Sequence, residues 1–349
     1  MKKIMFTGGG TLGHYSPNEA IYQKLKDKYI CEYIGSKNGI EKEFASKLMP
    51  YHKIETVKLD RTKIFKNFFI PFKLIKGIFE AKKILKQTKP DIIFSKGGFV
   101  SVPVVIAGHM LKIPCITHES DFTLGLANKI IAKKCKYVCT SFEETSISIK
   151  NGYYTGSIVR QQIFEGKPEI VAKKYKLDPL KKTILIVGGS LGAENLNYAI
   201  RKSLNKLTNY NILHLTGKGK IDNSIKFANY HQIEFASDIQ NYFCASDIVI
   251  TRGGSNTIFE ILALKKPMII VPLASGRGDQ ILNAQEFAKK GYAEVLQEKD
   301  ISDQSIFEII KKVHINYKQM QQNMQKFEKD GLFEICKIIK NLLENQKKS

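Results

Sequence analysis

The sequence predicts an α/β protein built from two doubly wound domains that face a cleft. Short apolar strands alternate with amphipathic helices through both halves of the 349 residues, which is the pattern of parallel sheets covered by helices on both faces. A glycine-rich loop also occurs twice, as FTGGGTLGHYSP at residues 6–17 and as IVGGSLGAENLN at residues 186–197. Each copy follows a strand and precedes a helix, so each marks the first strand-to-helix turn of a separate domain.

The strand, loop and helix units follow one another along the chain. The first is an apolar strand at 2–8, which ends in glycines and is followed by helical spacing at 16–28. Further units are expected at residues 91–111, 182–204 and 247–264, and at 267–273 with a helix near 281–290. The amphipathic end at 334–349 predicts a docking helix with a frayed tail.

Glycine, proline and a change in charge cluster at residues 151–169, which places a domain boundary near residue 160. The expected domains are residues 1–160, together with a C-terminal helix at about 332–349, and residues 161–331. A chain of this length is large enough for two hydrophobic cores.

The composition argues against a membrane-spanning, a secreted or a cysteine-ligated metal protein. No stretch approaches the ~20 apolar residues that cross a bilayer, and the MKKIMF start has no apolar run of a secretory signal. A protein that stays in the cytoplasm is therefore expected. The six cysteines are scattered without a C-x-x-C pair, so they are interpreted as reduced core residues rather than metal ligands.

The net charge of +22 is unevenly distributed. Residues 1–160 carry 27 Lys and Arg against 13 Asp and Glu, while residues 161–349 carry 28 against 20. Residues 58–89 hold ten basic and two acidic side chains interleaved with phenylalanine, isoleucine and leucine. Three interpretations of this segment are open: contact with an anionic membrane surface, a core helix with a solvated lysine face, or an electrostatic footprint for nucleic acid.

The glycine loops lie at helix N-termini, and this position indicates that they bind a ligand. Unpaired N–H groups and a partial positive charge make such a turn an anion site, and a diphosphate fits it. TRGGSNTIFE at residues 251–260 repeats the arrangement, with Glu260 placed to accept hydrogen bonds from both hydroxyls of a ribose. The alternative is a capping box in which Glu260 reaches back to the helix start. Neither loop is the G-x-G-x-x-G dinucleotide fingerprint.

Six motifs occur in the order and spacing of one known family. They are GGTLGHYSP, FSKGGFVSVP, HESDFTLGLANK, GGSLGAENLN, TRGGSNTIFE and RGDQILNA. In these motifs the chain resembles the MurG glycosyltransferases over nearly its whole length. The resemblance implies the GT-B fold, with an N-terminal acceptor domain and a C-terminal UDP-sugar domain. It also implies inverting transfer of GlcNAc from UDP-GlcNAc to the C4 hydroxyl of the muramyl sugar of lipid I, which gives lipid II and UDP in peptidoglycan synthesis.

The expected catalytic residues are His14 and Glu119. The acceptor hydroxyl must lose a proton as it attacks the anomeric carbon, and the neutral imidazole of His14 near pH 7 suits that task. Glu119 is the rival base or an orienting partner, while His118 beside it receives no chemical role. The first glycine loop would help to hold the acceptor's pyrophosphate and the second would face the donor diphosphate, which explains why the loop occurs twice.

The resemblance also implies binding residues. The donor set is Thr11, Gly13, Asn128, Arg160, Ser190, Phe235, Ala236, Ser255, Asn256, Thr257, Glu260, Asp279 and Gln280. The acceptor set is Gly9, Gly10, Gly97 and Gly98. Within the donor set, Glu260 would bind ribose, Gln280 the GlcNAc hydroxyls, and the backbone near Phe235 and Ala236 the uracil. Arg160 would supply a fixed positive charge to the leaving group.

Four positions depart from the common pattern of the family: Leu12, Asp121, Leu191 and Asp279. Asp121 and Asp279 touch proposed sugar contacts, but carboxylates also accept hydrogen bonds from sugar hydroxyls, so the substrate class is expected to survive. No cofactor is expected. Metal-independent turnover is predicted, because the chain has no D-x-D pair of the kind that holds a metal on nucleotide-sugars.

An acceptor carried on a polyprenyl chain cannot leave the bilayer, so the resemblance favours the membrane interpretation of residues 58–89. The expected partners are UDP-GlcNAc, lipid I and an anionic membrane surface, without nucleic acid, at the cytoplasmic face of the cell membrane. Alternatives are another GT-B glycosyltransferase with a lipid acceptor such as diacylglycerol, a UDP-sugar epimerase that needs no acceptor, and a non-catalytic nucleic-acid binder.

Overall fold

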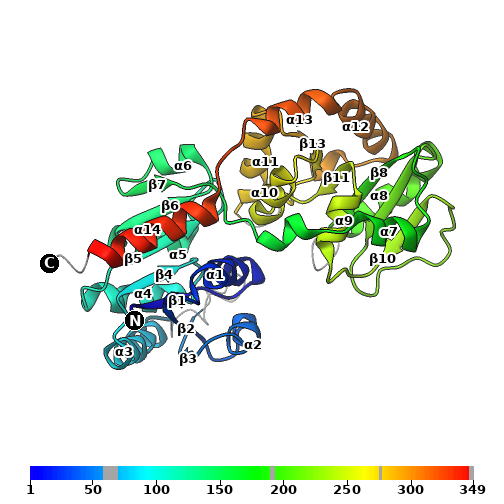
Figure 1. Ribbon diagram of the computed structural model, residues 1–349. Helices are drawn as coiled ribbons and strands as arrows, with labels where there is room; N and C mark the ends of the chain where they lie inside the picture. The colour runs from blue at the N-terminus through cyan, green and yellow to red at the C-terminus, as the bar shows by residue number, and fades with distance from the viewer. Residues whose placement is uncertain (58–69, 189–192, 275–276, 346–349) are drawn as a thin grey trace. The chain divides into compact units, whose positions relative to one another are not determined.

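The protein, in a computed structural model, consists of two compact units, each with its own sheet and its own core (Figure 1). Unit 1 comprises residues 1–160 and 329–349, and unit 2 comprises residues 161–328. The residues that the structure describes are 1–57, 70–188, 193–274 and 277–345. The chain therefore leaves unit 1 at Arg160 and returns to it at Lys329.

Unit 1 holds a seven-stranded parallel sheet in the order β3-β2-β1-β4-β5-β6-β7. Its strands are β1 (Lys3–Thr7), β2 (Ile30–Ser36), β3 (Tyr51–Ile54), β4 (Ile92–Ser95), β5 (Cys115–Glu119), β6 (Tyr137–Thr140) and β7 (Gly152–Tyr154). Its helices are α1 (Leu12–Leu25), α2 (Ile40–Ala45), α3 (Ile70–Thr88), α4 (Ser101–Met110), α5 (Leu126–Ile131), α6 (Glu143–Ile147) and α14 (Gly331–Asn345). The strand order reverses direction between β1 and β4, so ligands are expected beyond the carboxyl ends of those two strands.

Unit 2 repeats this plan with a six-stranded parallel sheet in the order β10-β9-β8-β11-β12-β13. Its strands are β8 (Lys182–Val187), β9 (Tyr210–Leu215), β10 (Tyr230–Ile233), β11 (Ile248–Thr251), β12 (Met268–Ile270) and β13 (Ala293–Val295). Its helices are α7 (Pro168–Tyr175), α8 (Glu194–Ser203), α9 (Ile239–Ala245), α10 (Ser255–Ala263), α11 (Asp279–Lys289), α12 (Asp303–Ile315) and α13 (Tyr317–Gln325). The strand order reverses direction between β8 and β11. GGSLGAENLN follows β8, and TRGGSNTIFE begins at the last residue of β11.

The central strands are apolar on both faces because helices cover both sides of each sheet. In β4 and β11, every residue is buried. The alternation of strands and helices predicted two doubly wound parallel sheets, and this prediction is confirmed.

One boundary differs from the prediction. The first helix begins at Leu12 rather than at residue 16, so Pro17 lies inside it. The glycines bring the chain around within a few residues, so Thr11, with an extended backbone, is already the N-cap residue, although its side chain makes no capping hydrogen bond. The helix therefore starts close to the end of β1, and His14 lies in its first turn.

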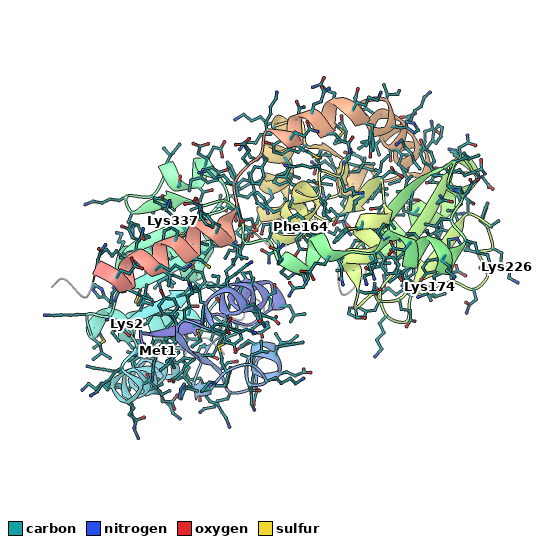
Figure 2. All side chains as sticks on the ribbon, viewed as in Figure 1. Met1, Lys2, Phe164, Lys174, Lys226 and Lys337 are labelled. Carbon is teal, nitrogen blue, oxygen red and sulfur yellow. The ribbon has the colours of Figure 1, made fainter. Side chains whose placement is uncertain are left out.

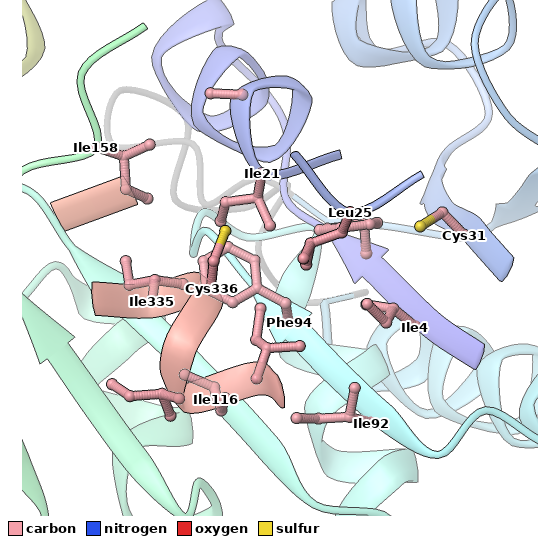
Figure 3. Packing of buried hydrophobic residues seen from close by; sticks show 14 of the residues in the cluster. Ile4, Ile21, Leu25, Cys31, Ile92, Phe94, Ile116, Ile158, Ile335 and Cys336 are labelled. Atoms are coloured by element: carbon pink, nitrogen blue, oxygen red, sulfur yellow. The ribbon is translucent and has the colours of Figure 1, made fainter. Parts of the chain in front are cut away.

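Helix α14 belongs to unit 1 although it comes from the other end of the chain. Ile335 and Cys336 lie in one cluster with Ile21 of α1 and Phe94 of β4 (Figure 3). Ile339 in the next turn is also fully buried. Burial of an aliphatic side chain contributes about 1.5–3 kcal/mol, so this helix is part of the core of unit 1.

Polar residues of the same elements face outward. Lys337 on α14 lies on the outside of unit 1, and Lys174 and Lys226 lie on the outside of unit 2 (Figure 2). Much of the basic excess is therefore solvated surface, and only a buried or clustered lysine is informative about function.

Candidate functional site

The first glycine loop joins β1 to α1 and carries His14. The Nδ1 atom of His14 lies 3.0 Å from the Thr11 hydroxyl, and the His14 backbone N–H donates to the Thr11 carbonyl. Gly10 has a φ of +88°, and a Cβ there would run into the Phe99 ring. The loop therefore needs glycine to make this turn, and it holds the imidazole close to the switch point of the sheet.

A second pair of glycines, Gly97 and Gly98, follows β4 and lies against the first loop. Both have positive φ, +83° and +77°. A Cβ on Gly98 would lie 3.1 Å from Nδ1 of His14 and 2.5 Å from the Gly9 carbonyl oxygen. The structure thus brings the four predicted acceptor glycines and His14 together at the carboxyl ends of adjacent strands.

Glu119, at the end of β5, is buried and fully hydrogen-bonded. One carboxylate oxygen accepts from the Asp121 backbone N–H at 3.1 Å. The other accepts from the Gly125 N–H at 2.8 Å and from the Asn128 side-chain amide at 2.9 Å. Burial raises the pKa of Glu119, and the charge of Asp121 adds to this effect. These contacts fold the segment between β5 and α5 around the carboxylate.

Asn128 has a complete set of partners inside unit 1. Its amide oxygen accepts from the Thr117 hydroxyl at 3.0 Å, and its amide nitrogen donates to Glu119 and to the His118 carbonyl. The predicted role of Asn128 in donor binding stays a prediction, since these contacts are internal to the unit. Arg160, the last residue of unit 1 before the crossing, lies close enough to lower the pKa of Glu19, although burial raises that pKa by more.

Lys96 is a site residue that sequence reasoning missed. It lies between β4 and Gly97, is 3% exposed, and donates from Nζ to the Ser120 hydroxyl at 2.6 Å. Burial lowers its pKa to about 8, although Glu119 and Asp121 oppose this shift. In the sequence it is one lysine among many, and its place inside the FSKGG motif was the only signal.

Lys96 also acts on the imidazole of His14. Burial and then the charge of Lys96 lower the pKa of His14 to about 4, while Asp121 and Glu41 act in the opposite direction. Part of the His14 surface remains exposed. At neutral pH the imidazole is therefore uncharged, and a nitrogen lone pair is available to accept a proton. His118, which received no chemical role, is fully buried and bonded to the Gly156 carbonyl oxygen at 3.2 Å.

In unit 2 the predicted donor residues gather at the start of α10. Gly254 precedes the helix, and Ser255, Asn256 and Thr257 form its first turn. Glu260, in the second turn, is 7% exposed. A Cβ on Gly253 would lie 2.5 Å from the carbonyl oxygen of Gln280, so the turn before α10 packs directly against α11.

The start of α11 supplies the other predicted sugar contacts. The Gln280 side-chain oxygen accepts from the Leu273 N–H at 3.0 Å, which leaves its NH₂ without a partner among the described residues. Asp279 pairs with Arg277 at 2.8 Å. After β10, Phe235 is 73% exposed and Ala236 is buried.

Two further residues of the second glycine loop lie outside the described part of the chain. They are Ser190, predicted to face the donor diphosphate, and Leu191. The helix that follows them, α8, is described from Glu194.

Asn197, the last residue of GGSLGAENLN, has a structural role that the motif alone does not reveal. It is 2% exposed, donates to the Thr216 carbonyl at 2.8 Å and accepts from Nε2 of His214 at 2.9 Å. The other ring nitrogen of His214 lies 2.8 Å from the Tyr230 hydroxyl. This buried chain links the first turn of α8 to the end of β9 and to the first residue of β10.

The match to known proteins covers both units. Residues 4–140 match the glycosyltransferase family 28 N-terminal domain, and residues 183–340 match the glycosyltransferase family 28 C-terminal domain. The UDP-N-acetylglucosamine--N-acetylmuramyl-(pentapeptide) pyrophosphoryl-undecaprenol N-acetylglucosamine transferase of Clostridium perfringens (strain SM101 / Type A) is 45% identical, over 97% of this chain and 98% of its own. This chain belongs to the MurG family of glycosyltransferases. The resemblance that the six motifs carry is thereby confirmed.

A second sequence relative agrees with this membership, and two solved structures share the fold. The transferase of the same name from Clostridium botulinum (strain Langeland / NCTC 10281 / Type F) is 45% identical over 97% of this chain and 99% of its own. The crystal structure of Acinetobacter baumannii MurG has a TM-score of 0.79 at 23% identity, covering 98% of this chain and all of that one. CalG4, the calicheamicin glycosyltransferase, has a TM-score of 0.72 at 12% identity, over 99% and 98% of the two chains. The two-domain GT-B fold expected for a MurG-family chain is confirmed.

Proposed function

We propose that this protein transfers GlcNAc from UDP-GlcNAc to the C4 hydroxyl of the muramyl sugar of lipid I, with inversion, and so forms lipid II. The observation that carries the proposal is the 45% identity, over nearly the full length of both chains, to transferases whose names state this donor and acceptor. The geometry supports it, because the glycine turns and ionisable groups lie at the switch point of each sheet.

The test is incubation of the purified protein with UDP-GlcNAc and a short-chain lipid I analogue in EDTA, following UDP release and product mass. A product heavier by one GlcNAc supports the donor, the acceptor class and metal-independent turnover together. UDP release without this product contradicts the acceptor assignment and leaves hydrolysis or another lipid acceptor such as diacylglycerol. Transfer that requires added divalent metal contradicts metal independence alone.

His14 is the proposed general base. For Nε2 to accept the proton, Nδ1 must carry its hydrogen and donate to the Thr11 hydroxyl 3.0 Å away, which also fixes the plane of the ring. His14→Gln is expected to lower kcat by about 10²–10⁴-fold, the usual contribution of general-base catalysis. His109→Gln is the control, since His109 is exposed on α4. Equal kcat in both variants would exclude His14 as the base.

Glu119 is the proposed orienting residue rather than the base. Its two oxygens already accept three hydrogen bonds, so its lone pairs are directed into the protein. Glu119→Gln is expected to lower thermal stability along with activity, because the amide NH₂ cannot accept a hydrogen bond and at least one of these three donors loses its partner. If Glu119→Gln keeps the stability of the wild type and loses only kcat, the result would favour Glu119 as the general base.

The donor is proposed to bind in unit 2. The N–H groups at the start of α10 and at the loop containing Ser190 would hold the diphosphate, and Glu260 would bind the ribose. The NH₂ of Gln280, which has no partner within the described part of the chain, suits an acceptor oxygen on GlcNAc. Glu260→Gln is expected to raise the KM for UDP-GlcNAc with a smaller effect on kcat, whereas the reverse pattern would contradict a ribose contact.

Peripheral attachment to the membrane is proposed for the face formed by α3, α4 and α5. On α3, Phe72, Ile75 and Phe79 are exposed at 65%, 52% and 67% and recur on one face of the helix. Gly77, Ala81 and Leu85 form the opposite, buried face. Exposed apolar groups with neighbouring lysines are the pattern of a helix that lies in the membrane interface.

The same face continues on the neighbouring helices. Helix α4 contacts both α3 and α5. Met110 on α4 is 53% exposed, and Leu126 and Ile130 on α5 are 49% and 46% exposed. Lys73 and Lys76 on α3 are exposed, while Lys63 and Lys66 of the predicted segment lie outside the described residues. No helix within the described ranges is long and apolar enough to cross a bilayer.

Sedimentation with liposomes that contain anionic lipid tests this proposal. Changing Phe72, Ile75 and Phe79 to serine is expected to release the protein, as is changing Lys63, Lys66, Lys73 and Lys76 to glutamate. Ile315→Ser is the control, since Ile315 is 73% exposed but lies in unit 2. Binding that survives both sets of changes would contradict the assignment of this face.

A further inference from the structure

Glu41, on the short helix α2, lies underneath the first glycine loop. Its side chain is fully buried. One carboxylate oxygen accepts from the Gly10 backbone N–H at 3.1 Å, and the other accepts from the backbone N–H and the hydroxyl of Ser36 at 3.0 and 2.5 Å. A loop of the kind that binds phosphate therefore already has one N–H bonded to an anionic group of the protein itself.

Hydrogen bonds, and not a cation from the described residues, stabilise the Glu41 carboxylate. Among the described residues no Lys, Arg or His forms an ion pair with it, so two N–H groups and one hydroxyl stabilise the carboxylate. A buried charge is tolerated only when its hydrogen bonds are made, and each of these donors is therefore constrained by Glu41. Ser36 ends β2, the neighbour of β1, so the carboxylate links the loop to the rigid sheet.

The position of the Glu41 carboxyl group leaves no room for a side chain at two glycines of unit 1. A Cβ on Gly9 or on Gly39 would run into the Glu41 carboxyl group. The absence of a side chain at Gly9 is thus explained by an internal carboxylate rather than by the close approach of a phosphate. Gly9 is also packed on its other side, where its carbonyl oxygen lies against Gly98.

We propose that Glu41 is a positioning residue for glycosyl transfer, an internal anion that fixes Gly9 and Gly10 and thereby the first turn of α1 with His14. This inference rests on the proposed role of His14. It also implies that the acceptor's pyrophosphate does not use the Gly10 N–H, because the Glu41 carboxylate occupies that donor.

Loss of the carboxylate should misplace the base without disturbing the donor site in the other unit. Glu41→Ala removes a methylene and a carboxylate, a group of the size of acetate. The variant is expected to lower kcat for the lipid I analogue by at least about tenfold, since a displacement near 1 Å can cost about 10²-fold. The KM for UDP-GlcNAc is expected to stay within about twofold of the wild type.

Added acetate or formate is expected to restore part of kcat in Glu41→Ala, whereas chloride at the same ionic strength is not. A purely structural role would not produce this rescue by a carboxylate. Glu43→Ala is the matched control on the same helix, because the Glu43 side chain is 69% exposed and its ion pair with Lys47 is long, at 4.0 Å. It is expected to behave as the wild type with or without acetate.

Hydrogen exchange gives a readout that does not depend on activity. In Glu41→Ala, and in Glu41→Gln if the alanine variant does not fold, exchange is expected to rise at the Gly10 amide. Unchanged exchange there, or wild-type kcat in a folded Glu41 variant, would overturn the proposal. If the wild-type protein makes no GlcNAc-containing product, the proposed function is refuted. Hydrogen exchange at the Gly10 amide then still decides whether Glu41 fixes the first glycine loop.

Discussion

Lys96→Met should make the protein more stable at neutral pH and should shift the acid limb of its pH–activity profile. The ammonium group is buried and, within the residues that the structure describes, donates one side-chain hydrogen bond, to Ser120. Its pKa falls from 10.5 to about 8, which corresponds to roughly 3 kcal/mol of preference for the neutral amine at about 1.4 kcal/mol per unit. Methionine has a similar length and no charge, and the lost hydrogen bond is worth about 1 kcal/mol. The net gain is about 2 kcal/mol in the free energy of unfolding at pH 7.

The pH dependence tests the cause of this gain. The folded-state pKa of Lys96 lies below its unfolded value, so between about pH 8 and pH 10.5 the unfolded chain binds more protons. Wild-type stability therefore rises with pH across this window, and the advantage of Lys96→Met should shrink by about 1 kcal/mol between pH 7 and pH 9. Urea unfolding at both pH values measures it, with Lys129→Met, at an exposed position on α5, as the control.

The same change should alter the pH profile of transfer. Lys96 is the second cause that lowers the pKa of His14 to about 4, and Asp121 and Glu41 act against it. Without the lysine, the pKa of His14 rises, and the acid limb of kcat/KM should move upward by about one pH unit. The assignment of Lys96 as a buried charge would be refuted if Lys96→Met were less stable than the wild type at pH 7. It would also be refuted if the stability difference between the two proteins did not change with pH.

Three further predictions concern the packing of each unit. Ile339→Ala on α14 is expected to lower the free energy of unfolding by about 2–5 kcal/mol in a urea titration, because the side chain is fully buried in unit 1. Asn197→Ala is expected to raise the KM for UDP-GlcNAc in steady-state kinetics, because it frees the first turn of α8 from Thr216 and His214. Burial lowers the pKa of His214 to about 3, below its unfolded value, so its contribution to stability is present above pH 6.5 and is lost on acidification. Between pH 6 and pH 4 the wild type should therefore lose roughly 1 kcal/mol per pH unit more than His214→Asn in urea unfolding.

Several features of the site could be predicted because they depend on local sequence. A glycine loop between an apolar strand and a helix lies at the carboxyl end of a parallel strand, so the positions of Gly9, Gly10, Gly97 and Gly98 do not depend on the sheet order. His14 followed from its place directly after the first loop. The same rule located Ser255 at the start of α10.

Other features depend on which strands become neighbours. Gly10 and Glu41 are 31 residues apart, and Asn197 and Thr216 are 19 apart, so no helical or strand period relates them. The contact between Gly98 and His14 exists because β1 pairs with β4 rather than with the strand after β2. Lys96 resembles any other lysine until the sheet closes around it.

The sequence by itself determined the two doubly wound sheets, their family and the turns at which the chemistry lies, because strand and helix periods and glycine turns act over a few residues. Only the tertiary structure decided which groups share those turns. It turned Glu119 and Asn128 inward to each other, placed Glu41 beneath the first loop and buried Lys96 beside His14. The physical reason is that burial and charge depend on neighbours brought together by strand order, and the cost of desolvating a charge is set by those neighbours and not by the residue's place in the chain.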